Sequence, residues 1–172
     1  MRRGTLLRSA AALAFLLALP LTAQQAAFVV RHAEKASEAN DPPVPLSQTG
    51  AARARRLAVL LKNAGITEIY STDFVRTRAT AAPLAEALKL PIQIYAAKDA
   101  QGKPTAGPLL DQLARRGRNE VVLIVGHSDN VPVILKGLGC EQEIAIAVNE
   151  YNNLFVVVPR GSGPPLLLRL QY

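Results

Sequence analysis

Cysteine and histidine are both scarce in this sequence. Cys140 is the only cysteine among 172 residues, so the chain can form no internal disulfide and must be stabilised by its core. No histidine lies near Cys140 in sequence, and we interpret it as a small buried apolar residue rather than a nucleophile. The only two histidines are His32 and His127, and each follows an apolar run that is typical of a buried strand.

Long basic tracts interleaved with aromatic residues are absent as well. The formal net charge is +7, but three of the positive charges are Arg2, Arg3 and Arg8 at the N-terminus. Without them the remainder carries 7 − 3 = +4, which is only mildly basic. A nucleic-acid partner is therefore not expected, whereas a basic pocket for a small anionic ligand needs far fewer charges.

The N-terminal apolar run is too short to cross a bilayer. It covers residues 10–19, about half of the ~20 residues that a transmembrane helix needs. Pro20 ends the run, and Ala23 offers a small residue for cleavage. This pattern predicts a secretory signal peptide over residues 1–23 and one mature domain over residues 24–172, periplasmic or secreted, with no stable membrane span after cleavage. An uncleaved N-terminal anchor and a misassigned start codon are the alternatives.

What the chain does have is a regular alternation of apolar runs and helical patterns. Hydrophobic residues make up 49% of it, and its length suits a single domain. The predicted strands are residues 26–31, 66–71, 92–95, 120–125, 151–158 and 166–170. The predicted helices are one that starts at Ser47 and those over residues 73–88, 105–116 and 129–138. We therefore predict a three-layer α/β/α fold with a mostly parallel central sheet and an antiparallel C-terminal hairpin.

Two of the predicted helices carry signals at their ends. Ser47 is a good N-cap for the first helix. Its expected inner face consists of Ala54, Leu57, Ala58 and Leu61. For the 73–88 helix, we expect Ser71 or Thr72 to be the N-cap and Pro83 to cause a kink or a break.

Residues suited to phosphate chemistry fall at the carboxyl ends of predicted strands, where ligands bind in open α/β sheets. They are Arg31, His32, Arg76 and His127. An arginine guanidinium matches phosphate oxygens, and a neutral imidazole is a competent nucleophile toward phosphorus. A second imidazole, when protonated, stabilises charge on the transferring group, and helix N-termini add backbone donors. The set favours phosphoryl transfer through a phosphohistidine.

The same residues carry a family resemblance. The chain opens its first motif with Arg31-His32-Ala33-Glu34, and Thr72, Arg76 and Thr80 follow at the family's spacing. With His127 after an apolar strand, the chain resembles the histidine phosphatase superfamily (branch 1, phosphoglycerate mutase-like), as a small exported phosphatase-type member. The resemblance runs from about residue 27 to the C-terminus.

The resemblance implies a role for each motif residue. His32 would be the phosphorylated nucleophile, and Arg31 and Arg76 would hold the phosphate. His127 would complete the pocket and contact the phosphate, with the backbone amide near Ser128 as a further donor. The implied activity is hydrolysis of a phosphomonoester, either a small phosphorylated molecule or a phosphoprotein.

Several positions depart from the family pattern, and the first is Ala33, which stands where a glycine is common. Sugar-phosphate mutases of the family carry an asparagine seven residues beyond the motif arginine, and this position is Glu38 here. Many relatives place a glutamate after the third strand as the acid that protonates the leaving oxygen. This chain offers only Asp99 in that loop, with Asp129 as a rival, and either is a candidate proton donor.

Three functions remain open from the sequence. A phosphatase acting through phospho-His32 is the leading hypothesis, and no metal or other cofactor is expected because both histidines already have roles. A pseudophosphatase that binds phosphorylated ligands or protein partners is the alternative, supported by the unassigned acid. A phosphomutase is a weaker alternative, because both Glu38 and the predicted export argue against it.

Overall fold

The computed structural model describes residues 26–37, 43–115 and 120–172. The predicted signal peptide, residues 1–23, and Glu38 lie outside these ranges. Within them, no helix is both long enough and apolar enough to cross a membrane.

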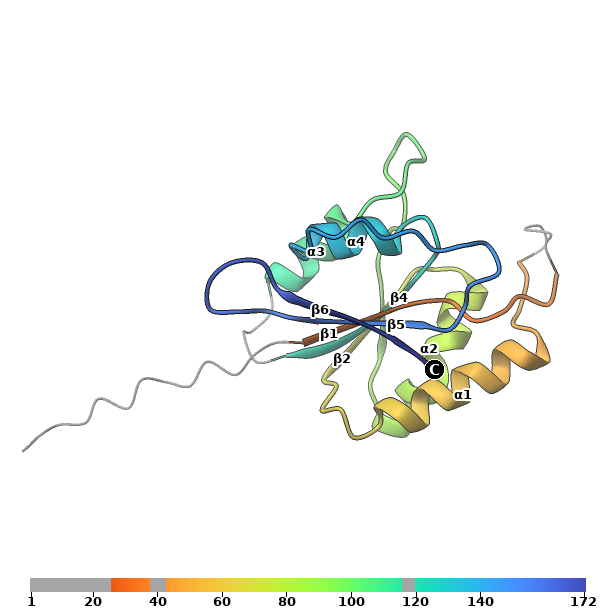
Figure 1. Cartoon of the computed structure of the whole chain (residues 1–172). Helices are drawn as coiled ribbons and strands as arrows, with labels where there is room; N and C mark the ends of the chain where they lie inside the picture. Colours follow the sequence, from red (N-terminus) through yellow and green to blue (C-terminus); the bar gives the residue numbers. More distant parts are fainter. Residues whose placement is uncertain (1–25, 38–42, 116–119) are drawn as a thin grey trace, which may run out of the picture.

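A six-stranded sheet forms the centre of the molecule, with strand order β3-β2-β4-β1-β5-β6 (Figure 1). The strands are β1 Ala26–Arg31, β2 Glu68–Ser71, β3 Ile92–Ile94, β4 Val121–Gly126, β5 Asn153–Val158 and β6 Leu166–Gln171. The helices are α1 Gln48–Leu61, α2 Val75–Leu88, α3 Gly107–Ala114 and α4 Val131–Gly137. Strands β3, β2, β4 and β1 are parallel, whereas β5 and β6 form an antiparallel hairpin beside β1. The predicted fold class is confirmed.

The helices make two layers around this sheet. Helices α1 and α2 cover one face, and α3 and α4 cover the other (Figure 1). Side chains of the central strands alternate between the two cores: Val29 and Ile124 pack toward α3 and α4, and Val30 and Leu123 toward α1 and α2. Because β1 and β4 are buried on both faces, their sequences read as continuous apolar runs.

The first helix begins as predicted. Ser47 is its N-cap, with its side-chain oxygen accepting a hydrogen bond from the Gly50 amide at 3.0 Å. The predicted inner-face residues Ala54, Leu57, Ala58 and Leu61 are all buried. The apolar spacing therefore located this helix and its inner face correctly.

The start of the second helix differs from the prediction. Helix α2 begins at Val75 with Phe74 as its N-cap, and no side chain caps it. The Ser71 hydroxyl donates to the Thr72 carbonyl, and the Thr72 hydroxyl is bonded elsewhere, so neither is available as a cap. The helix also continues through Pro83 to Leu88 without a break.

The strand order brings the two histidine motifs together. Strand β4 lies directly beside β1, with Arg31 opposite Gly126, so His32 and His127 follow neighbouring strand ends. After β1 the chain passes through α1 to β2 on one side, and after β4 it passes through α4 to β5 on the other. The connections that leave β1 and β4 therefore run in opposite directions along the sheet. In open α/β sheets a ligand-binding crevice forms at the carboxyl ends of two such strands.

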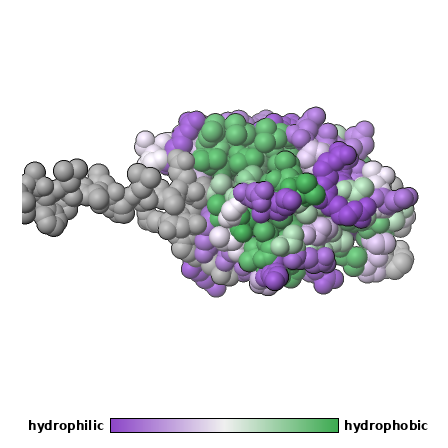
Figure 2. Space-filling view, turned by 90° about the horizontal axis from the view of Figure 1, so that it is seen from below, coloured by the Kyte–Doolittle hydropathy of each residue, from purple (hydrophilic) through white to green (hydrophobic). Residues whose placement is uncertain are grey.

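The outer strand β6 carries an apolar face. Leu167 packs against the core on the α3 and α4 side, so the alternating Leu166, Leu168 and Leu170 face the opposite side and are partly exposed. The view from below shows an apolar area on this face of the molecule (Figure 2).

Candidate active site

A pocket of about 320 Å³ lies at the carboxyl ends of the parallel strands. Its lining residues lie at the ends of the four parallel strands or in the segments after them: Arg31, His32 and Lys35; Phe74 and Arg76; Ala97 and Lys98; and His127, Ser128 and Asp129. The structure thus brings together Arg31, His32, Arg76, His127, Ser128 and Asp129 from the predicted set. A larger hollow of about 1020 Å³ beside α4 contains neither histidine, so the smaller pocket is the candidate active site.

His32 is held in one orientation by hydrogen bonds to the backbone carbonyls of Gly126 and Ala33. Its amide donates to the Gly126 carbonyl at 2.9 Å, and its ring Nδ1 lies 2.8 Å from the Ala33 carbonyl oxygen. A carbonyl oxygen can only accept, so in the neutral ring Nδ1 carries the proton and Nε2 keeps its lone pair. Burial lowers the pKa of His32 to about 3, and the charges of Arg31 and Arg76 contribute to the decrease. The ring is therefore neutral near pH 7 and has a nucleophilic nitrogen.

His127 stands across the pocket from His32, with ring centroids 5.3 Å apart and planes at 67°. Its Nε2 lies 3.0 Å from the Thr72 hydroxyl, which is 2.8 Å from the Thr77 hydroxyl. Burial lowers the pKa of His127 to about 3, with Arg76 the largest charged contributor. An anion bound between the arginines would reverse part of this decrease, because it favours the protonated ring.

The backbone at His127 is fixed by a buried asparagine. The His127 amide donates to Asn130 Oδ1 at 2.7 Å, and Asn130 is fully buried. The Tyr95 hydroxyl, which donates to the Val125 carbonyl at 3.1 Å, packs beside it. Asn130 was not predicted from the sequence. Its position three residues after His127 is nevertheless typical of a side chain that accepts a hydrogen bond from a backbone amide at the start of a helix.

Arg31 is positioned by a loop far along the chain. It is 5% exposed, and its Nη1 donates to three carbonyl oxygens of the 147–150 turn at 2.8–3.1 Å. Its guanidinium also stacks on the Tyr151 ring, 4.0 Å from the centroid, and the same ring lies 5.9 Å from the His32 ring. Tyr151 and the turn before it were not found from the sequence, since no local pattern links them to Arg31.

Arg76 comes from the first turn of α2. Within the described ranges, its buried Nε has no hydrogen-bond acceptor. Its guanidinium lies 4.4 Å from the Phe74 ring centroid, and Phe74 packs edge-on against His127 at 4.9 Å. Burial lowers the pKa of Arg76, with the Arg31 charge next in size and Asp129 acting in the opposite direction. Arg76 also lines the pocket, so its guanidinium is placed to bind an anion there.

The third residue of the second motif, Thr80, links α2 to the loop after His32. Its hydroxyl donates to the Arg76 carbonyl at 2.8 Å and accepts the Ala33 amide at 2.9 Å. Both Ala33 and Thr80 are fully buried. The motif threonine therefore fixes the backbone next to His32.

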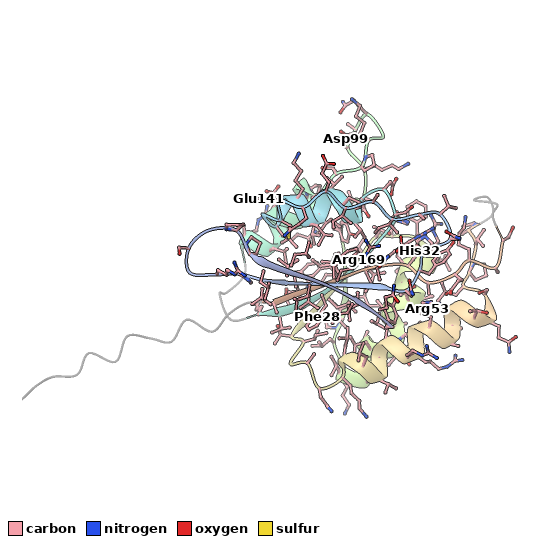
Figure 3. The ribbon with its side chains drawn as sticks, in the orientation of Figure 1. Phe28, His32, Arg53, Asp99, Glu141 and Arg169 are labelled. Atoms are coloured by element: carbon pink, nitrogen blue, oxygen red, sulfur yellow. The ribbon has the colours of Figure 1, made fainter. Side chains whose placement is uncertain are left out.

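Glu34 is not among the residues that line the pocket. It forms a two-pronged ion pair with Arg53 of α1, with Arg53 Nε at 2.9 Å and Nη2 at 2.7 Å from the carboxylate. The Glu34 carbonyl also accepts the Ser47 amide at 2.9 Å. Figure 3 shows Arg53 on the α1 side of His32. The pair anchors the loop after His32 to the first helix.

The two candidate proton donors are placed very differently. The Asp99 carboxylate accepts hydrogen bonds from the Gln101 and Lys103 backbone amides, both at 2.9 Å, and so stabilises the turn that follows it. It lies on a projecting arm, the loop between Lys98 and Pro104, well away from His32 (Figure 3). It is not part of the pocket lining. Asp129 does line the pocket, two residues after His127. The geometry therefore favours Asp129 over Asp99.

No group of three or more His, Cys, Asp or Glu side chains in the described ranges is arranged to hold a metal ion. The side chains lining the pocket that could bind a metal ion are two imidazoles and one carboxylate, and they lie among four cationic side chains. This donor set suits an anion rather than a cation.

The depressed histidine pKa values predict acid destabilisation. Unfolded histidine titrates near 6.5 and the folded rings near 3, so below pH 6.5 the unfolded state binds more protons. The stability contribution is complete above pH 6.5 and is lost as the pH falls toward 3. The pKa of Glu34 lies below 4.5, so this carboxyl contributes to the pH dependence of stability only at lower pH. We expect the free energy of unfolding in urea to drop between pH 6.5 and 4.5 by at most about 1.4 kcal/mol per pH unit for each histidine.

A His32→Asn variant is the control for this titration. It should show a shallower pH dependence in the same window, because one of the two buried imidazoles is gone. A wild-type urea midpoint that stays constant from pH 6.5 to 4.5 would contradict the buried, neutral state of the two rings.

Part of the chain matches a known protein family. Residues 27–97 match the family model of the histidine phosphatase superfamily (branch 1). No curated protein sequence shows a significant match. Among solved structures, the protein histidine phosphatase SixA complexed with tungstate superposes with a TM-score of 0.67 at 21% identity, covering 86% of this chain and 97% of the other.

Two further structures are similar in fold. A mycobacterial glucosyl-3-phosphoglycerate phosphatase has a TM-score of 0.63 at 15% identity, covering 87% of this chain and 98% of the other. A phosphoserine phosphatase from Entamoeba histolytica in complex with 3-phosphoglyceric acid has a TM-score of 0.63 at 16% identity, covering 86% and 97%. Residues 27–97, which include the Arg31-His32 motif, thus resemble the histidine phosphatase superfamily (branch 1), and the chain shares its fold with phosphatases of known structure.

Proposed function

We propose that the protein is a phosphomonoester hydrolase that forms a phosphohistidine on His32. The observation that carries this proposal is the hydrogen bond from His32 Nδ1 to the Ala33 carbonyl at 2.8 Å. It leaves Nε2 unprotonated in a pocket that also holds two arginines and a second histidine. Phosphatases among the solved structures with this fold support the reaction class.

The first half of the reaction transfers the phosphoryl group to the enzyme. Arg31 and Arg76 hold the phosphate oxygens, and His32 Nε2 attacks phosphorus while the bond to the leaving oxygen breaks. The positive charge that develops on the ring is stabilised through its Nδ1–H by the Ala33 carbonyl. Asp129 supplies a proton to the leaving oxygen, since it is the carboxyl that lines the pocket.

The second half returns the enzyme to its starting state. A water molecule attacks phosphorus, the P–N bond breaks, and inorganic phosphate leaves with His32 Nε2 regaining its lone pair. Asp129 accepts the proton that the water loses. His127 faces the transferring group throughout, and it stabilises the added negative charge once the bound phosphate has raised its pKa.

Trapping the intermediate tests this proposal. The protein is mixed with a phosphoryl-labelled phenyl phosphate, quenched in alkali, and mapped by peptide mass spectrometry. The label is expected on the His32 peptide, to resist alkali and to be lost in acid, as a phosphoramidate is. His32→Asn should carry no label and show no turnover of the aryl phosphate above background.

The remaining outcomes separate the other candidate functions. Label on His127 instead of His32 would overturn the assignment of the nucleophile. Phosphate binding without any label or turnover would indicate a pseudophosphatase. Transfer of the phosphoryl group to another position of a sugar phosphate, rather than to water, would indicate a mutase.

A further inference from the structure

Two threonine hydroxyls form a short chain of hydrogen bonds behind His127. Thr72 Oγ1 lies 3.0 Å from His127 Nε2 and 2.8 Å from Thr77 Oγ1. Both threonines are fully buried, where a hydroxyl without a hydrogen-bond partner is costly. The positions of the hydroxyl protons are therefore set by the neighbouring groups.

The direction of the chain is set at Thr77. Its hydroxyl lies 2.8 Å from the Phe74 carbonyl oxygen and 3.1 Å from the Thr72 carbonyl oxygen. A carbonyl oxygen can only accept, and a hydroxyl has a single proton to donate. The Thr77 proton is thus directed to these carbonyls, and Thr77 Oγ1 accepts the proton of Thr72. With its own proton used, Thr72 Oγ1 can only accept from His127 Nε2.

This arrangement puts the proton of the neutral His127 ring on Nε2, so Nδ1 keeps its lone pair. His32 has the opposite tautomer, because its Nδ1 donates to the Ala33 carbonyl. Within the described ranges, His127 Nδ1 has no hydrogen-bond partner, and the ring lines the pocket. Nδ1 is therefore the nitrogen of His127 that is available to a bound ligand.

The charges around the pocket oppose a second proton on this ring. The other titratable or cationic side chains that line the pocket are Arg31, His32, Lys35, Arg76, Lys98 and Asp129. Burial first, and then the charges of Arg76, Arg31 and Lys98, lower the pKa of His127 to about 3. A protonated His127 is stabilised when both ring nitrogens donate to an acceptor, and Thr72 Oγ1 is the acceptor already in place at Nε2.

We propose that Thr72 is a positioning residue that fixes the tautomer of His127, with Nε2 protonated in the resting protein and Nδ1 protonated only when an anion binds. Thr77 keeps Thr72 in the accepting role. The second proton, taken up from solvent, then sits at Nδ1 against the bound anion, while Nε2–H continues to donate to Thr72. This inference rests on the proposed function and states how His127 acts in it, but the resting tautomer does not depend on turnover.

Nitrogen NMR measures the tautomer directly, because protonated and unprotonated ring nitrogens resonate in separate regions. The chain has only two histidines, so isotope-labelled full-length protein without a histidine tag gives two ring systems, and His32→Asn leaves only that of His127. Near neutral pH we expect Nε2–H for His127 and Nδ1–H for His32. Thr72→Ser should keep the His127 tautomer, and Thr72→Val should lose the fixed preference. Thr77→Val should reverse it, because the Thr72 proton then turns to His127 Nε2.

The pH dependence of kcat shows whether Thr72 also supports the protonated ring. With an aryl phosphate, kcat should fall at high pH as His127 in the substrate complex loses its second proton. In Thr72→Val this limb should move to lower pH by about one unit, the effect of losing one hydrogen bond to a charged group, whereas Thr72→Ser should keep the wild-type profile. Ser71→Ala is the matched control, because the buried Ser71 hydroxyl donates to a backbone carbonyl, so tautomer and profile should both stay unchanged.

The outcomes separate this inference from the phosphatase proposal. Nδ1–H on His127 in the wild type, or an unchanged tautomer and pH profile in Thr72→Val, would overturn it whatever the turnover. If Thr72→Val does not fold, Thr77→Val carries the same test, and a tautomer that is not reversed there would overturn the inference. If no phosphomonoester is turned over, the phosphatase proposal fails, and the spectra of the resting protein still decide the tautomer.

Discussion

Replacing Arg76 with alanine is expected to lower kcat/KM for an aryl phosphate by about 10³-fold, the loss typical of one charge-stabilising group at a transferring phosphoryl. Arg76 lines the pocket, and we expect its guanidinium to contact a phosphate oxygen there. Because the charge on the phosphoryl oxygens is rearranged in the transition state, kcat should fall as well as KM rise. Steady-state kinetics with a chromogenic aryl phosphate measure both.

Arg78→Ala is the matched control for this prediction. Arg78 lies on the same helix two residues further on, is exposed, and does not line the pocket. Its removal should change kcat/KM by less than about twofold, as expected of a surface charge. Arg76→Lys should recover only part of the loss, because an ammonium cannot form the two parallel bonds of a guanidinium. A loss in Arg76→Ala of less than tenfold would contradict a direct contact with phosphate.

Replacing Gly50 with alanine is expected to damage both stability and activity. A Cβ atom at Gly50 would lie 2.3 Å from the Glu34 carbonyl oxygen and 2.9 Å from the Glu34 nitrogen. These are backbone atoms two residues after His32, and they are tied to α1 by the Ser47 amide and the Arg53 ion pair. The clash can be relieved only by moving helix α1 or the loop after His32, at a cost of about 3 kcal/mol, the upper part of the range for overpacking.

Thermal unfolding and kinetics together check the Gly50 prediction. A destabilisation of this size corresponds to a decrease in Tm of about 6–12 °C for a chain of this length. Gly161→Ala is the control, because a Cβ there meets nothing within 4 Å and its φ is not positive, so its Tm should stay close to wild type. A Gly50→Ala variant with wild-type Tm and wild-type kcat would show that the close packing of α1 on residue 34 is unimportant.

Local patterns in the sequence were sufficient for the fold and for part of the site. The apolar runs located all six strands, and Ser47 marked the start of α1, because caps and strand patterns depend on neighbouring residues. The motif residues His32, Arg76 and His127 were expected at strand ends and do line one pocket. Their catalytic roles, and the signal-peptide interpretation of residues 1–23, stay predictions.

The features that the sequence did not reveal depend on long-range contacts. Arg31 is held by a turn more than 110 residues later in the chain, and no periodicity links the two. Thr72 was expected to cap α2, but its hydroxyl bonds to His127, which only the neighbouring positions of β2 and β4 could show. Asp99 and Asp129 could be separated only after the arm around Asp99 was seen to project away from His32 (Figure 3).

The position of β4 also has a consequence for folding. Strand β4 lies between β2 and β1, although it follows both of them in the chain. Until residues 121–126 have joined the sheet, β1 and β2 lack the strand that lies between them. A sheet that contains both β1 and β2 therefore requires β4. We expect folding to be slow and strongly cooperative, because the insertion of β4 both completes the sheet and brings the pocket residues together.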